Sequence, residues 1–114
     1  MIRFVFLAFV LAIPPAFAAA HSKSAGTTPA DGATVAEVSE LSMQFDAPMR
    51  IISVTLSAAD GDIPIERETG TDPVTVFRAT PLQDLAPGSY RLDWRGMAAD
   101  GHPMQGSFSF TKSK

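Results

Sequence analysis

His21 and His102 are the only histidines in the chain, and both stand where an imidazole could bind a metal ion. His21 directly follows Ala20, the last small residue of an apolar leader, so signal cleavage there would make it the first residue of the mature chain. An N-terminal histidine offers its α-amine and its ring Nδ1 to one ion, a chelate that an internal histidine cannot make without deprotonating a backbone amide. His102 lies near the other end of the chain, in the run Asp100–Pro103.

The available donors favour copper. The chain contains no cysteine, so a metal site must use nitrogen, carboxylate oxygen or thioether sulfur. Two nitrogens of His21 and one of His102 would form a T-shaped set, with Asp100 or water in the remaining position. Cu(II) prefers such a tetragonal set, whereas Zn(II) prefers a tetrahedral one. We therefore expect one Cu(II) per chain, bound by His21, Asp100 and His102. The alternative is a metal-free turn in which Asp100 merely bonds backbone amides.

The methionines do not suggest a second, dedicated Cu(I) site. Met43 falls on a core-facing strand position and is expected to pack rather than to bind metal. Met49, Met97 and Met104 are less constrained, and the last two flank the loop that holds Asp100. No cluster of closely spaced methionines is present, so thioether binding of Cu(I) is not predicted.

Residues 1–20 have the features of a secretory signal, with Arg3, an apolar run and small residues at the end. Cleavage would leave residues 21–114, and these 94 residues are expected to form one small domain. The apolar run is too short to span a membrane, so we expect an exported, soluble monomer with no membrane insertion after cleavage. Loss of Arg3 changes the net charge from −3 to −4, and this acidity argues against nucleic-acid binding.

Alternation of apolar and polar residues recurs along the mature chain, and no long helical pattern occurs. The fold class is therefore predicted to be all-β, an immunoglobulin-like Greek-key sandwich or barrel of about seven strands. Residues 22–28 form the expected first strand, and residues 67–73 a surface loop. In the other strands, one face carries the apolar side chains. They are Leu41, Met43 and Phe45; Ile52, Val54, Leu56 and Ala58; Ile63 and Ile65; the strand over 74–78; Tyr90, Leu92 and Trp94; and Met104, Phe108 and Phe110. The run Asp100–Pro103 then connects the last two strands as a short hairpin loop.

Two segments of the chain resemble the CopC family of periplasmic copper-binding proteins. The first runs from His21 to Gly32, with its Thr-Thr-Pro-Ala-Asp-Gly turn, and the second from Tyr90 to Phe108, with Asp-Trp-Arg and Asp-Gly-His-Pro-Met-Gln-Gly. The resemblance implies a Greek-key β-sandwich, periplasmic location and tight Cu(II) binding by the amine and ring of His21, by His102 and by Asp100. It also implies copper buffering or delivery in copper homeostasis or resistance, beside an inner-membrane CopD-type copper transporter.

The sequence differs from the family pattern in three places. The polar Ser22 and Ser24 stand where members often have alanine and leucine. Residues 58–65 lack the methionines that bind Cu(I) in some members. Asp46 is the nearest counterpart of an acidic residue often found after the third-strand phenylalanine region.

Two other functions are compatible with an N-terminal histidine on a β-sandwich. One is a copper monooxygenase of the lytic polysaccharide type, but such an enzyme needs a broad face for a polymer, and most aromatics here fall on core-facing positions. The other is a metal-free, immunoglobulin-like interaction module. We expect a binding protein rather than an enzyme.

Overall fold

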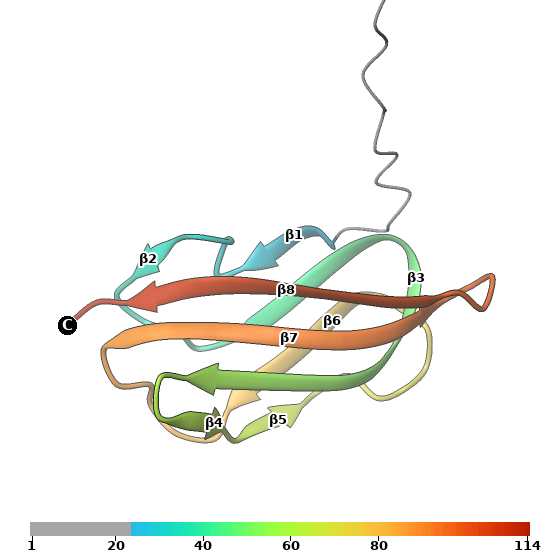
Figure 1. Cartoon of the computed structure of the whole chain (residues 1–114). Coiled ribbons are helices and arrows are strands. Elements are labelled where there is room, and N and C mark those ends of the chain that lie inside the picture. Colours follow the sequence, from blue (N-terminus) through green and yellow to red (C-terminus); the bar gives the residue numbers. More distant parts are fainter. Residues whose placement is uncertain (1–23) are drawn as a thin grey trace, which may run out of the picture.

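The computed structural model describes residues 24–114, which form eight strands and no helix (Figure 1). This confirms the all-β prediction. In chain order the strands are β1 (Ser24–Thr28), β2 (Thr34–Val35), β3 (Leu41–Ala58), β4 (Gly61–Ile63), β5 (Ile65–Arg67), β6 (Val74–Pro81), β7 (Gly88–Ala98) and β8 (Pro103–Lys112). None of the described residues forms a helix of the length and apolarity needed to cross a bilayer.

The long strand β3 connects the two halves of one curled sheet. Its first part pairs with β1 and β6, and its second part, from Met49 onward, pairs with β7 and β4. Figure 1 shows β3 curving as it passes between these partners. The path β2-β8-β7-β3-β6-β5 is therefore one sheet that curls on itself, where the sequence predicted separate strands over 41–45 and 52–58.

The apolar side chains of β3, β6, β7 and β8 fill the space inside the curled sheet. Phe45 packs edge-on against Trp94, with ring centroids 5.2 Å apart, and Tyr90 stacks on Phe110 at 5.4 Å. The Tyr90 hydroxyl also donates a hydrogen bond to the Ala86 carbonyl, which ties the turn before β7 to that strand. The predicted core positions of β7 are confirmed, because Tyr90, Leu92 and Trp94 are all buried. Burial of this apolar surface is the main source of stability in a domain without disulfides.

Ile52 is a correction to the predicted pattern. Its side chain is 53% exposed, whereas the neighbouring Ile51 is fully buried. The register of β3 against β7 shifts between Ile51 and Ser53, which is a β-bulge, and the extra residue reverses the alternation at that point. Sequence periodicity alone places Ile52 with Leu56 on the core face, and that expectation was wrong.

Arg67, the last residue of β5, stabilises the bulge through its side chain. Its guanidinium donates to the Ile51 carbonyl at 2.7 Å and to the Gly70 carbonyl at 3.1 Å, and it lies 5.1 Å from the centroid of the Phe77 ring. Arg50 donates to the Thr71 carbonyl at 2.8 Å. These contacts fix the loop that follows β5 against β3, so the bulge is held in one geometry.

The hairpin of β7 and β8 carries the loop that contains His102. The two strands stay in register from Gly88 opposite Lys112 to Met97 opposite Pro103. Figure 1 shows that the loop lies at the end of this long hairpin that is remote from the C-terminus. Because the hairpin is paired along its whole length, it is a rigid support for the loop.

Candidate metal centre

The loop between β7 and β8 is a tight turn that requires a glycine. Gly101 has φ +87°, a conformation that residues with a Cβ rarely adopt. The Ala98 N–H donates to the His102 carbonyl at 2.9 Å, and the Gly101 N–H donates to the Ala98 carbonyl at 2.9 Å. These backbone bonds hold Asp100 and His102 on the same side of a closed loop.

Asp100 holds His102 through both of its carboxylate oxygens. Oδ1 accepts the backbone N–H of His102 at 3.1 Å, and Oδ2 lies 2.6 Å from the ring Nδ1. These hydrogen bonds, first the one from the backbone N–H and then the one from the ring, hold the pKa of Asp100 below its ordinary value. The carboxylate is therefore negative at neutral pH and favours the tautomer in which Nδ1 carries the proton.

This arrangement leaves the Nε2 atom of His102 as the ring nitrogen that can accept a metal ion. The side chains of His102 and Asp100 are 76% and 62% exposed, so an ion in solution can reach them. A ligating histidine commonly donates its other ring N–H to a carboxylate, which orients the ring and makes it more basic. The turn motif thus has the backbone bonding of an ordinary Asp turn together with the ring orientation that a metal site uses.

The other predicted ligand, His21, lies outside the described residues. The described chain begins at Ser24, which is paired with Phe45 on β3, one residue before Asp46. Asp46 is exposed at the point where β3 curves toward β7. Among residues 24–114, no three His, Asp or Glu side chains lie close enough together to hold a metal ion. The described part of the proposed centre is therefore the Asp100–His102 pair.

The four methionines in the described part of the chain lie in different environments. Met49 is buried in the core, as is Met43, which confirms the packing role predicted for Met43. Met97 is 38% exposed on the outer face of β7, while Met104 is half-buried and lies on the same, core-facing side of β8 as Phe108 and Phe110. Met97 and Met104 therefore project to opposite faces of the hairpin, although both residues line the open depression beside the loop.

Comparison with known proteins identifies relatives along nearly the whole described chain. The family model described as the CopC domain matches residues 24–113. Copper resistance protein C of Pseudomonas syringae pv. tomato is 29% identical, over 83% of this chain and 82% of that protein. Copper resistance protein C of Xanthomonas campestris pv. juglandis is also 29% identical, over 94% of this chain and 90% of that protein.

Solved structures show the same fold. PcoC, a methionine-rich copper resistance protein from Escherichia coli, superposes with a TM-score of 0.68 at 22% identity, over 82% of this chain and 99% of that one. CopC from Methylosinus trichosporium OB3b superposes with a TM-score of 0.67 at 20% identity, over 82% and 94% of the two chains.

Proposed function

The chain belongs to the CopC domain family, and we propose that it is an exported protein that binds one Cu(II) ion and buffers or delivers copper. The observation that carries this proposal is the Asp100–His102 pair. An exposed imidazole has one ring nitrogen held at 2.6 Å by a carboxylate and the other available to an ion. The relatives in Pseudomonas and Xanthomonas that match this chain are named copper resistance protein C.

The proposed donors are the α-amine and ring Nδ1 of His21 and the ring Nε2 of His102. Asp100 contributes its negative charge, which partly compensates that of the ion, either as a ligand or by orienting the ring. This set contains nitrogen and oxygen only, and it suits Cu(II) better than Cu(I), which prefers soft sulfur donors. The chain between His21 and Ser24 can extend about 11 Å at most, so the position of Ser24 on β1 limits where the amine can lie.

The proposed location is the periplasm, after cleavage of residues 1–20. Residues 21–114 would then form the mature copper-binding domain. A CopD-type transporter of the inner membrane is the proposed copper-exchange partner. In this proposal the protein binds and transfers the ion without catalysing a reaction, and it acts as a monomer.

The test depends on the α-amine of His21, which exists as a ligand only after correct processing. Cu(II) affinity and the electron paramagnetic resonance spectrum are measured for protein that begins at His21 and for protein that retains Ala20. We expect weaker binding and an altered spectrum when Ala20 remains, because the amine is then part of a peptide bond. Equal affinities with identical spectra would remove His21 from the proposed site, and no Cu(II) binding by either form would refute the function.

A further inference from the structure

We propose that the outer surface of β3, β7 and β8 next to the His102 loop is the docking site for the protein that exchanges copper with this chain. We call this surface the exchange face and define it by six of the eight residues that line an open depression there: Ile52, Ser53, Arg95, Met97, Pro103 and Gln105. The inference builds on the proposed function, because it assigns a surface and a partner chemistry to the same metal site.

The part of the exchange face nearest the loop is apolar. Among the described residues, three large hydrophobic side chains are exposed: Ile52 at 53%, Met97 at 38% and Leu82 at 62%. Two of the three therefore lie on this one surface, next to Pro103, which pairs with Met97 across the hairpin. The β-bulge is what turns Ile52 outward to join them. Exposed apolar groups gathered in one place are a common feature of protein interaction sites.

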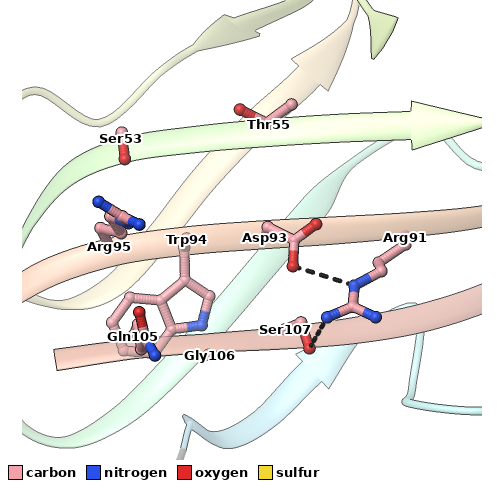
Figure 2. Close-up of a pocket in the computed structure, with 9 residues that line it drawn as sticks. All are labelled: Ser53, Thr55, Arg91, Asp93, Trp94, Arg95, Gln105, Gly106 and Ser107. Carbon is pink, nitrogen blue, oxygen red and sulfur yellow. Dashed lines mark hydrogen bonds and ion pairs between the residues drawn. The ribbon is translucent and has the colours of Figure 1, made fainter. Parts of the chain in front are cut away.

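The next part of the exchange face carries one charged side chain, Arg95, in a chain whose net charge is −3. Arg91 is engaged, since its guanidinium lies 3.0 Å from the Asp93 carboxylate (Figure 2). Arg95 is exposed on the same face and forms no ion pair with a carboxylate in the described part of the chain. Figure 2 shows Arg95 beside Ser53 and apart from the Arg91–Asp93 pair. A carboxylate on a partner would complement this charge.

The surface is also hollowed. An open depression of about 470 Å³ lies along the polar part, and another of about 620 Å³ lies along the apolar part. Ser53, Arg95 and Gln105 line both, so the two depressions adjoin. Arg95 and Met97 are two positions apart on one strand, which separates their side chains by roughly 7 Å. The fitting partner is therefore a protein surface with a carboxylate about 7 Å from an exposed apolar side chain.

The position beside the loop is what connects this surface with copper exchange. The backbone of Ala98 bonds to His102, and Pro103 follows His102 directly, so a protein seated on the exchange face touches the strand ends that hold the ligand loop. Transfer of an ion between two proteins requires that both sites approach closely while water and other ligands are kept away.

The experiment uses the full chain, exported in its native cells, with a photoreactive benzoylphenylalanine at position 97 and, as a matched control, at position 82. Both positions carry an exposed apolar side chain, but Leu82 lies off the exchange face. We expect a cross-linked protein from position 97 that is absent from position 82. Mass spectrometry then maps the contact on the partner, which should contain an Asp or Glu beside an apolar residue.

A charge exchange completes the test. Arg95→Glu should lower the cross-linking yield from position 97 on the order of tenfold or more, because like charges then face each other. Lys114→Glu makes the same charge change away from the face and should have no effect. Changing the mapped carboxylate of the partner to arginine should restore the yield with Arg95→Glu.

The proposal is overturned if position 97 yields no product, yields the same product as position 82, or yields a lipid or a second copy of this chain. It is equally overturned if Arg95→Glu leaves the yield unchanged. Cu(II) affinity and melting temperature of Arg95→Glu should match the unmodified protein. Because copper titration is separate from cross-linking, failure of the copper proposal and failure of the docking proposal give different results.

Discussion

Gly106 lies on β8 directly opposite Trp94 on β7, and it is the position where the smallest change in side chain should be felt most. A Cβ added at Gly106 would lie 2.8 Å from the indole Nε1 of Trp94, 2.9 Å from Cε2 and 3.0 Å from Cζ2. All three distances are shorter than ordinary contacts between unbonded atoms. Trp94 is only 5% exposed and packs against Phe45, so the ring has little room to move away. Figure 2 shows the indole beside Gly106.

We therefore expect Gly106→Ala to destabilise the protein. Overpacking of a well-filled core typically costs about 1–3 kcal/mol of unfolding free energy. In a domain of this size each kcal/mol lowers the melting temperature by roughly 4–8 °C. A cost of about 2 kcal/mol therefore corresponds to a decrease of about 8–16 °C in the melting temperature. Copper affinity at low temperature should be unchanged, because Gly106 lies in the strand and not in the loop that holds His102.

The assay is thermal and urea unfolding of Gly106→Ala beside a matched control, Gly70→Ala. A Cβ at Gly70 meets no atom within 4 Å, and Gly70 does not have a positive φ, so the control should be neutral or slightly more stable. In a protein that also carries Trp94→Phe, Gly106→Ala should lower the free energy of unfolding by less, because the smaller phenylalanine ring leaves more room for the added Cβ. Equal stability of the Gly106 and Gly70 variants would refute the close packing on which the prediction rests.

His102→Ala should weaken Cu(II) binding more than Asp100→Ala does. Asp100→Ala removes the partner that orients the His102 ring, which should lower the affinity about 10- to 100-fold. Competitive titration of both variants gives the order, and the reverse order would contradict the assigned roles. Hydrogen bonds from His102 lower the pKa of Asp100 below its ordinary value of 3.8. The stabilisation from this contact should therefore be complete above pH 3.8 and be lost only as the pH falls through the lowered pKa. An NMR titration of the Asp100 carboxyl carbon with a midpoint at or above 3.8 would contradict this prediction. Ile51→Ala should lower the free energy of unfolding by about 2–5 kcal/mol and Ile52→Ala by no more than about 0.5 kcal/mol, since only Ile51 is buried. Similar losses for the two variants in urea unfolding would argue against the bulge. Cu(II) should stabilise protein that begins at His21 by about 2.7 kcal/mol when the free ion exceeds its dissociation constant a hundredfold, and protons should compete for the nitrogen donors at acidic pH; thermal melts with and without copper measure both effects.

The all-β class, the core of β7 and the hairpin that carries the loop could be predicted from residue order because each depends on local alternation. Tyr90, Leu92 and Trp94 alternate with polar residues, and a strand must place such residues on one face. Asp100 and His102 could be recognised as a pair because they are two positions apart in a turn between two strands. The resemblance of the segment from Tyr90 to Phe108 to CopC proteins agreed with the match of the family model.

Other features depend on pairing between distant strands, which local patterns do not encode. The bulge at Ile52 arises from the register of β3 against β7, so periodicity assigned that side chain to the wrong face. The curve of β3 arises because its two halves pair with different strands, and the sequence pattern read them as separate elements.

The hydrogen bond between the Asp100 carboxylate and the His102 ring could also be identified only from the tertiary structure. Spacing shows that the two residues are near each other, but only the closed geometry of the loop brings Oδ2 to 2.6 Å from Nδ1 and leaves Nε2 available. Likewise, Ile52, Arg95 and Met97 come from separate parts of the sequence, and the sheet gathers them on one face. Sequence alone determined the donor types and the local turn, because these are properties of single segments. Only the folded sheet decided which side chains lie beside the Asp100–His102 loop, because those positions follow from cross-strand register.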